Sequence, residues 1–273
     1  MERWWVDGQP GGSPAPDDRG LAYADGLFET MAVRGGRPRF LSRHLDRLLA
    51  GCARLSLPAP DRSSLSTDLE AACNGVRHGV LKLMLTAGRG PRGYARPPTP
   101  SPTVIWGVAG TGPVAAAPIA VRWCATMTPV SPVIAGLKTI GRLEQVLARA
   151  EWDDPAIAEG LMASTEGWVV GATAGNVFLV EEGRLVTPSV ARCGVAGVMR
   201  GLVIDTARAA GLEVRVTDVS PATLAAASEL FVTNALTGLR PVCRLDGHDR
   251  DPGPVSRQLQ ALLADAGVDE CAG

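Results

Sequence analysis

Lysine is scarce in this sequence. The 273 residues include 27 lysines and arginines, yet only Lys82 and Lys138 are lysines. Nearly every position that requires only a positive charge therefore carries arginine, which stays protonated at any useful pH. A partly desolvated lysine, by contrast, can lose its proton and attack a carbonyl carbon. Each lysine is thus a candidate for chemistry that arginine cannot perform, although the chance survival of two lysines is the simpler interpretation.

Histidine and closely spaced cysteine are also too scarce to support several kinds of site. Only three histidines are present, which leaves little material for a histidine-based metal site or for a Ser-His-Asp triad. The six cysteines are widely scattered and form no Cys-x-x-Cys motif. This spacing argues against a zinc site or a disulfide framework and favours reduced thiols in a cytosol.

Long apolar runs and a strong net charge are absent as well. No run is long enough to span a bilayer, and residues 1–7 lack the apolar stretch of a signal peptide. The net charge is −1 and the arginines are spread along the chain, which gives no argument for binding to nucleic acid or to a membrane surface. Apolar residues make up 46% of the chain and charged residues 20%. We therefore expect a cytoplasmic globular protein with no nucleic-acid or membrane partner.

The length and the distribution of glycine and proline predict two domains. Residues 110–117 are rich in Gly, Ala and Pro and form a candidate linker. We predict a small N-terminal domain over residues 1–112 and a larger C-terminal domain over residues 118–273, which carries Lys138. Strands and helices follow one another irregularly rather than as strict βα repeats, which predicts an α+β fold.

Periodicity and turn residues place the expected elements along the chain. Extended segments are expected over 3–6, 21–33, 79–86, 103–109, 118–126, 157–163, 168–173, 176–181, 184–187, 212–217, 229–233 and 239–245. Helices are expected from an N-cap at Ser42 and over 62–74, 139–152, 198–210, 221–227 and 254–266.

Lys138 lies where a loop is expected to pass into a helix. It follows a proline-containing loop and Gly136, and it opens the amphipathic pattern predicted over 139–152. A lysine at such a junction can point into a cleft while the helix fixes its backbone. Lys82 instead lies within a strand-like run, where a sheet edge or a solvated face is the simpler role.

A second pattern suits a phosphate. Residues 194–200, Gly-Val-Ala-Gly-Val-Met-Arg, begin a helix with glycines, and the free backbone N–H groups of a helix start bind phosphate well. Glycine-rich helix starts are common, so this pattern alone is a weak signal. Arg47 is a second candidate phosphate ligand, although an arginine on a helix is usually solvated. A lysine for an aldehyde, together with a helix start and an arginine for a phosphate, describes a pyridoxal-phosphate site.

Four motifs occur in an order that resembles one enzyme family. They are Gly-Leu-Ala-Tyr-Ala-Asp-Gly-Leu-Phe-Glu-Thr at 20–30, Arg-His-Leu-Asp-Arg-Leu at 43–48, Gly-Leu-Lys-Thr-Ile-Gly-Arg-Leu-Glu-Gln-Val at 136–146, and the glycine-rich run at 194–200. Over nearly the whole chain they resemble the class IV (fold type IV) pyridoxal-phosphate enzymes. Within that family, the last two motifs are most similar to the 4-amino-4-deoxychorismate lyases.

The resemblance implies a fold, a cofactor and an assembly. It implies a two-domain α+β fold of the D-amino-acid aminotransferase type, a homodimer, and pyridoxal 5'-phosphate in the interdomain cleft. Lys138 matches the lysine that forms the Schiff base with the cofactor, and Arg47 matches the arginine that binds its phosphate. Val198 and Met199 match the helix-start positions whose N–H groups complete that phosphate site. Further matches are Thr233, Asn234 and Ala235 on a second phosphate-side loop, and Arg92 and Tyr94 near the substrate carboxylates.

Two positions depart from the family pattern. Gly171, in the run Val-Gly-Ala-Thr-Ala-Gly-Asn at 170–176, stands where the family usually has a glutamate that pairs with the protonated pyridine nitrogen. Without that carboxylate the ring nitrogen holds its proton poorly, and the cofactor becomes a weaker sink for a carbanion. Gly141 stands where the lyases mostly have asparagine.

The resemblance and the departure at Gly171 together favour a lyase. Such an enzyme, a carbon–oxygen lyase, would release pyruvate from 4-amino-4-deoxychorismate and leave 4-aminobenzoate for folate synthesis. Formation of the aromatic ring is a driving force that can tolerate a weak sink, whereas a transaminase has no such help. Lys138 would act as general base and acid for the proton shifts. The alternatives are a branched-chain or D-amino-acid aminotransferase of the same fold, and a homologue with impaired or lost pyridoxal-phosphate chemistry.

Overall fold

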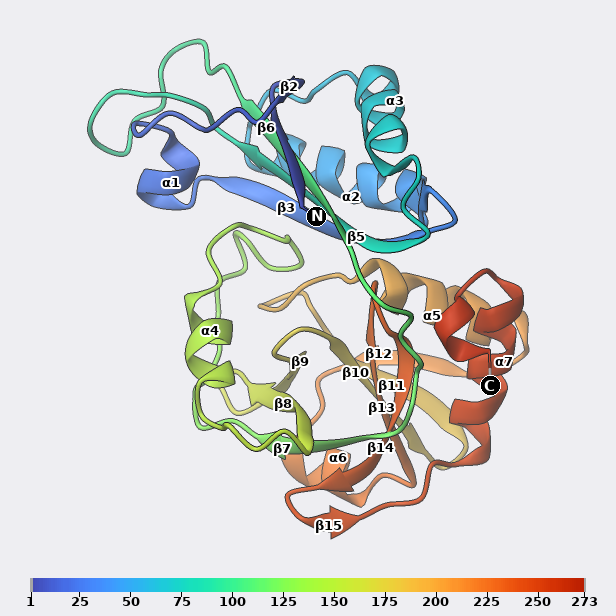
Figure 1. The fold of residues 1–273 in the computed structure, drawn as a ribbon. Helices are drawn as coiled ribbons and strands as arrows, with labels where there is room; N and C mark the ends of the chain where they lie inside the picture. Colours follow the sequence, from blue (N-terminus) through green and yellow to red (C-terminus); the bar gives the residue numbers. More distant parts are fainter. Residues whose placement is uncertain (1, 273) are drawn as a thin grey trace. The chain divides into compact units, whose positions relative to one another are not determined.

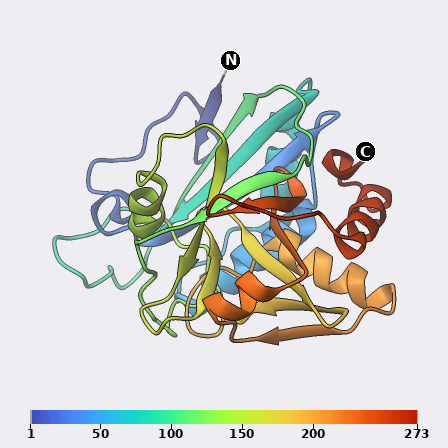
Figure 2. The same cartoon turned by 90° about the horizontal axis from the view of Figure 1, so that it is seen from below.

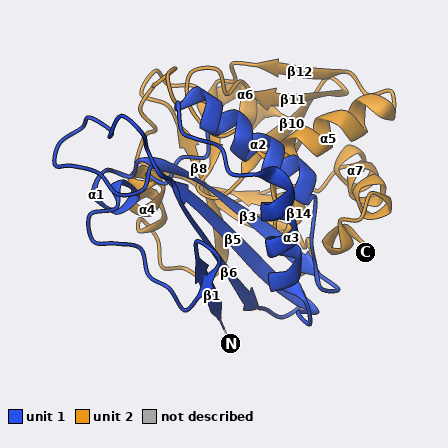
Figure 3. Cartoon of the chain, turned by 90° about the horizontal axis from the view of Figure 1, so that it is seen from above, with its two compact units in different colours: residues 1–113, 137–141 blue, residues 114–136, 142–273 orange. Residues whose placement is uncertain are grey.

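The computed structural model describes residues 2–272 of the chain (Figure 1). The chain forms two compact units, which Figure 3 distinguishes by colour. Unit 1 comprises residues 1–113 and 137–141, and unit 2 comprises residues 114–136 and 142–273. The boundaries at 112 and 118 stay a prediction as the limits of separate domains.

Unit 1 is an antiparallel sheet with two longer helices packed against it. The strands lie in the order β2-β1-β6-β5-β3-β4. Their bounds are β1 Arg3–Val6, β2 Gln9–Pro10, β3 Gly26–Arg34, β4 Arg37–Pro38, β5 His78–Thr86 and β6 Thr103–Gly110, and the helices are α1 Arg19–Tyr23, α2 Leu41–Arg54 and α3 Arg62–Cys73. Apolar residues of α2 recur every three or four positions and are buried, as at Leu41, Leu45 and Leu48. They pack with alternate residues of β5 into one core.

Unit 2 is built on a larger, mixed sheet. The strands lie in the order β12-β11-β10-β13-β14-β7-β8-β9, with β15 paired to β14. Their bounds are β7 Ile119–Trp123, β8 Ile157–Ala163, β9 Val169–Ala172, β10 Asn176–Glu181, β11 Arg184–Pro188, β12 Val214–Thr217, β13 Glu229–Asn234, β14 Gly238–Leu245 and β15 His248–Asp249. The pairs β7–β8, β7–β14 and β11–β12 are parallel and the other pairs are antiparallel. Along the chain, helices and strands alternate irregularly, as the sequence predicted for an α+β fold.

The helices of unit 2 flank this sheet. They are α4 Leu143–Arg149, α5 Val198–Ala209, α6 Pro221–Ala226 and α7 Pro254–Asp265, followed by a 3₁₀ turn over Asp269–Cys271. Figures 1 and 2 show α5 and α7 side by side, and both contact β13. Phe178 and Phe231 stack on neighbouring strands with their ring centroids 5.1 Å apart and form part of the buried interior.

Two predictions near the start of the chain were wrong. Residues 21–33 do not form one extended segment, because α1 precedes β3. The Asp18 side chain accepts a hydrogen bond from Gly20 N and caps the start of α1, and Ala24 ends the helix in the left-handed region with φ 54°. Ser42 is not the N-cap of α2, since that position is held by Phe40, again with a positive φ of 55°.

The segment that carries Lys138 clusters with unit 1, whereas the sequence placed this lysine in a C-terminal domain, and that domain assignment stays a prediction. Its backbone pairs with β3, because Phe28 N donates to Lys138 O over 2.9 Å and Ile140 N donates to Gly26 O over 3.0 Å. Leu137 is buried in the core of unit 1. These long-range bonds hold the segment extended, so α4 begins only at Leu143 and Lys138 does not open a helix.

Lys82 takes one of the two roles that the sequence left open for it. It lies on β5, between β6 and β3, and therefore not at an edge of the sheet. Its side chain is exposed on one face of that sheet, which is the solvated face that the sequence offered as the alternative to an edge.

In the described part of the chain, no helix is both long and apolar enough to cross a membrane.

Candidate active site

Lys138 is held against an aromatic ring of β3. Its Nζ lies 4.1 Å from the centroid of the Phe28 ring, and the Phe28 N–H donates to the Lys138 carbonyl. The side chain is half-buried. A cation over the face of an aromatic ring is attracted to it, so contacts on both the backbone and the side chain orient this amine.

A buried carboxylate orients Arg47. Glu29 of β3 is only 1% exposed and accepts a hydrogen bond from Arg47 Nε over 2.8 Å and a second one from Arg47 Nη2. It also accepts from His44 Nδ1 over 2.6 Å. His44 and Arg47 are three residues apart on α2 and so lie on the same face of that helix. Two hydrogen bonds to the Glu29 carboxylate fix the plane of the Arg47 guanidinium group, whereas a single bond would leave it free to rotate.

The charges of this network follow from burial and pairing. Burial acts to raise the pKa of Glu29, but the hydrogen bonds from His44 and Arg47 outweigh it and the pKa is lowered. Burial lowers the pKa of His44, and the charges of Arg47 and Lys138 add to that effect against the opposing pull of Glu29. Glu29 is therefore ionised beside Arg47, and His44 is the neutral donor.

The network was missed at the level of single residues. Glu29 and His44 lie inside two of the motifs that carry the family resemblance, but neither was assigned a role. Their pairing joins a strand to a helix across the hydrophobic core, and nothing in the local sequence indicates that a glutamate in an apolar strand faces a particular helix.

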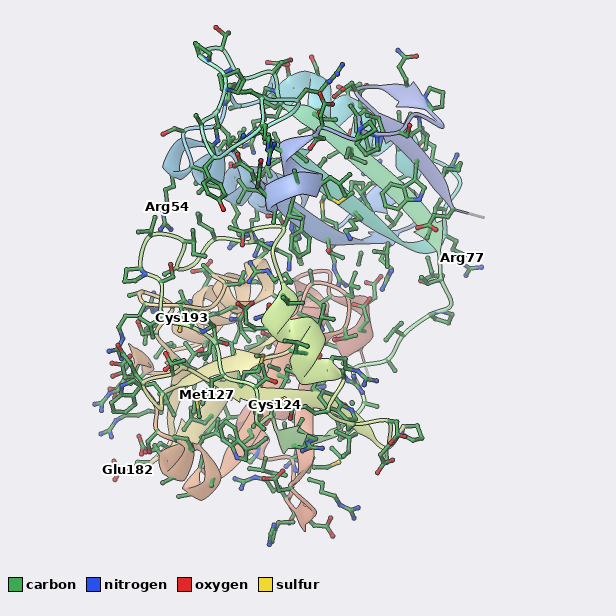
Figure 4. All side chains as sticks on the ribbon, turned by 90° about the vertical axis from the view of Figure 1, so that its left-hand side faces the viewer. Arg54, Arg77, Cys124, Met127, Glu182 and Cys193 are labelled. Atoms are coloured by element: carbon green, nitrogen blue, oxygen red, sulfur yellow. The ribbon has the colours of Figure 1, made fainter. Side chains whose placement is uncertain are left out.

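The start of α5 in unit 2 has no side-chain cap among the described residues. Gly197 is the N-cap, with φ −64° and ψ 141°. The N–H groups of Val198 and Met199 lie at this start, after the loop that Cys193 marks in Figure 4. A β-carbon at position 197 would lie 2.1 Å from Asn176 Oδ1, so only glycine fits beside that amide. An uncapped helix start with glycine at its N-cap suits a phosphate group.

Asn176 links the α5 start to a second polar group. Its Nδ2 donates to Val195 O over 2.9 Å, which holds the loop before α5. Asn176 also pairs with Thr233 across β10 and β13. Thr233 is 1% exposed, and its Oγ1 has no hydrogen-bond partner among the described residues. A buried hydroxyl without a partner is costly, and a ligand oxygen beside it would satisfy it.

Asn234 and Ala235 follow Thr233 in a tight turn. Asn234 Oδ1 accepts from Leu236 N and from Thr237 N, each over 2.9 Å. The Asn234 side chain, which the resemblance placed on a phosphate-side loop, therefore stabilises the turn of that loop through hydrogen bonds to its backbone. An uncapped helix start and an unpartnered hydroxyl, joined through Asn176, fit the phosphate of a cofactor.

Gly171 lies on β9, and the turn over residues 173–175 that follows it places a backbone oxygen where a side chain at 171 would begin. A β-carbon at 171 would lie 2.9 Å from Gly175 O, a backbone atom, and that same oxygen accepts from Ala172 N over 2.8 Å. The turn is held from β8 by Glu159, which accepts from Thr173 Oγ1 over 2.5 Å and from Ala174 N over 3.3 Å. Burial raises the pKa of Glu159.

The two residues predicted near the substrate lie on an exposed loop of unit 1. Arg92 and Tyr94 are both exposed, and the Tyr94 ring, at 88% exposure, contacts the edge of the Tyr23 ring with centroids 5.5 Å apart. Within unit 1 the structure thus gathers Lys138, Arg47 and their partners around β3, and it places Arg92 and Tyr94 on the loop between β5 and β6.

The chain belongs to the class IV aminotransferase family. The model of that family, described as amino-transferase class IV, matches residues 26–245. The predicted family and its type IV fold are therefore confirmed.

Three relatives show where in the family the chain lies. Aminodeoxychorismate lyase of Vibrio harveyi is 30% identical over 277 residues, which cover 95% of this chain and 99% of that protein. The crystal structure of 4-amino-4-deoxychorismate lyase from Pseudomonas aeruginosa is 46% identical and covers 97% of this chain and 99% of its own, with a TM-score of 0.90. Branched-chain amino acid aminotransferase from Escherichia coli shares the fold alone, at 20% identity over 98% of this chain and 95% of its own and a TM-score of 0.86.

Proposed function

We propose that this chain is an aminodeoxychorismate lyase. With pyridoxal 5'-phosphate it would release pyruvate from 4-amino-4-deoxychorismate and leave 4-aminobenzoate for folate synthesis. The observation that carries the proposal is the likeness to a lyase of known structure, 46% identical over 97% of this chain. The lysine, the arginine and the uncapped helix start described above support it.

The cofactor would be held by the residues that the family resemblance assigned to it. In unit 1, Lys138 would bind it through its amine, and Arg47, oriented by Glu29, would bind its phosphate. In unit 2, the N–H groups of Val198 and Met199 and the Thr233 hydroxyl would donate to the phosphate oxygens. Asn234 and Ala235 would shape the loop beside them.

The bound cofactor would supply an electron sink for the substrate carbon that carries the amine. As the bond between the ring and the enolpyruvyl oxygen breaks, Lys138 Nζ would remove the proton from that carbon and give a proton to the methylene carbon of the departing group, which leaves as pyruvate. The Phe28 ring would keep the amine in place between these two transfers. Arg92 and Tyr94 would orient a carboxylate of the substrate, since a guanidinium matches a carboxylate at two points. Gly171 leaves the sink without its usual carboxylate partner. Aromatisation of the ring would offset that weakness.

An aminotransferase is the other activity to be tested. The chain is 26% identical over 264 residues to a D-alanine aminotransferase of Listeria innocua. Gly171 disfavours this activity, because a transaminase gains no aromatic product that would compensate for a weaker sink.

We also propose a homodimer in the cytoplasm. Leu143, Val146 and Leu147 form an apolar stripe on α4 and are 66%, 62% and 53% exposed, which suits burial against a second copy. The cysteines of the described residues form no disulfide, which suits a reducing compartment.

The test compares two lysine variants in two assays. Wild type and Lys82→Ala should turn yellow with pyridoxal phosphate and keep the label after borohydride, whereas Lys138→Ala should not. Wild type should release 4-aminobenzoate from 4-amino-4-deoxychorismate. Amino transfer to 2-oxoglutarate without 4-aminobenzoate would replace the lyase with an aminotransferase, and a colourless wild-type protein would indicate that the chemistry is lost.

A further inference from the structure

The loop that carries Arg92 and Tyr94 is fastened from inside by one buried arginine. Arg19 of α1 is only 3% exposed. Its guanidinium donates to three successive carbonyls of the loop, those of Gly93 over 3.0 Å, Tyr94 over 2.8 Å and Ala95 over 3.2 Å. Because these carbonyls turn inward to meet the guanidinium, the backbone of the loop has a defined path while the Arg92 and Tyr94 side chains stay exposed.

A shared carboxylate holds Arg19 in turn. Asp25 accepts from Arg19 Nε over 3.0 Å and from Arg96 Nε over 2.9 Å. Arg96 lies on the far side of the same loop and also donates to Leu55 O. Burial acts to raise the pKa of Asp25, but the hydrogen bonds from Arg96 and Arg19 outweigh it and the pKa is lowered. Asp25, which directly precedes β3, is thus ionised between two arginines. It binds Arg96 on one side of the loop tip and Arg19, which holds the other side.

Tyr23 and Gly90 make further contacts with Arg19 and with the loop. The Tyr23 hydroxyl accepts from Gly93 N over 3.0 Å, and the Tyr23 ring lies 4.9 Å from the Arg19 guanidinium. Gly90 packs on the aliphatic part of Arg19, where a β-carbon would lie 2.8 Å from Cδ. The base of the loop is also tied to this region, because Asp18 accepts from Thr86 and Thr103 at the ends of β5 and β6.

We propose that Arg19 is a positioning residue for substrate binding: it presets the 92–95 backbone so that Arg92 and Tyr94 meet a substrate carboxylate without first having to be ordered. The inference rests on the proposed function, which gives those two side chains their ligand. A loop ordered in advance spends less binding free energy on ordering itself. Lysine cannot replace Arg19, because an ammonium group lacks the planar set of donors that reaches three carbonyls and Asp25 together.

The first experiment measures the loop without reference to activity. In Arg19→Lys, the backbone amide of Gly93, which donates to the Tyr23 hydroxyl, should exchange with deuterium about tenfold faster or more, while the amides of β3, β5 and β6 keep their wild-type rates. Arg62→Lys is the matched control, since Arg62 is an exposed arginine that pairs with Asp46 elsewhere in unit 1. Unchanged exchange in the loop overturns the inference. Should Arg19→Lys fail to fold, Asp25→Asn, which takes the charged partner from Arg19, should speed exchange at Gly93 to a smaller degree.

The second experiment asks whether Arg19 acts through Arg92. With 4-amino-4-deoxychorismate as substrate, Arg19→Lys should raise KM about tenfold or more and leave kcat and the cofactor absorbance within about threefold of wild type. In an Arg92→Met background, Arg19→Lys should raise KM by a clearly smaller factor than in wild type, because one of the two side chains that it positions is already gone. The inference is overturned if the double variant raises KM by the product of the factors found for Arg19→Lys and Arg92→Met alone. It is also overturned if Arg19→Lys lowers only kcat and cofactor content.

The two proposals fail in different ways. A wild-type protein that forms no 4-aminobenzoate refutes the lyase, and the exchange rates of the loop then decide alone whether Arg19 fastens it. A wild-type lyase whose KM is insensitive to Arg19→Lys refutes the positioning role and leaves the lyase intact.

Discussion

Replacement of Gly197 by alanine tests whether Asn176 holds the start of α5. The backbone of Gly197, with φ −64° and ψ 141°, is open to any residue, so the substitution introduces no backbone strain. The obstacle is contact alone, because the new methyl group would lie 2.1 Å from Asn176 Oδ1. Asn176 is 9% exposed and must move away to admit it.

The cost follows from what Asn176 would lose. Its hydrogen bond to Val195 O, 2.9 Å long, contributes about 0.5–1.5 kcal/mol. Overpacking at a buried site adds about 1–3 kcal/mol. We therefore expect Gly197→Ala to lower the free energy of unfolding by about 1.5–4.5 kcal/mol.

Gly201 provides the matched control on the same helix. A β-carbon there meets no atom within 4 Å, so Gly201→Ala should stabilise the protein by up to about 1 kcal/mol through the helix propensity of alanine. Urea unfolding followed by circular dichroism measures both variants, and titration with pyridoxal phosphate followed by absorbance measures the affinity of the α5 start. A Gly197→Ala protein within about 0.5 kcal/mol of wild type, with unchanged affinity, would refute the role given to Asn176.

Three further predictions concern Gly171 and the hydrogen bonds among Glu29, His44 and Arg47. Gly171→Glu should cost about 1–3 kcal/mol in urea unfolding, because its β-carbon meets Gly175 O at 2.9 Å, and should not raise the rate of 4-aminobenzoate release; a faster variant would contradict the close contact with Gly175 O. Glu29→Gln should weaken cofactor binding about tenfold in an absorbance titration, since Arg47 loses a charged partner, whereas Glu182→Gln at an exposed site should not. Lowering the pH below about 6.5 should reduce the free energy of unfolding, because unfolded His44 takes up a proton that the folded side chain, with its lowered pKa, does not. Glu29, whose pKa is also lowered, adds a further loss as the pH falls through about 4.5, and His44→Gln should remove the first of these two losses in urea unfolding at successive pH values.

Much of this protein could be predicted from local patterns. The apolar spacing of α2, the alternation along β5 and the glycine-rich entry to α5 are properties of neighbouring residues, and each marks an element that the structure contains. The ordered motifs predicted the family, which the family model confirms. The single lysine of the third motif lies against Phe28, in a position where its amine is oriented.

What the tertiary structure alone decided are the partners that lie far apart in the sequence. Pairing of residues 138–140 with β3 keeps Lys138 extended and in unit 1, although a helical pattern follows it directly. Glu29 meets Arg47 across a core, and Arg19 meets a loop more than seventy positions away. Burial and pairing of a polar side chain depend on which distant segment packs over it. The periodicity of the segment that carries the side chain gives no information about which distant segment this is.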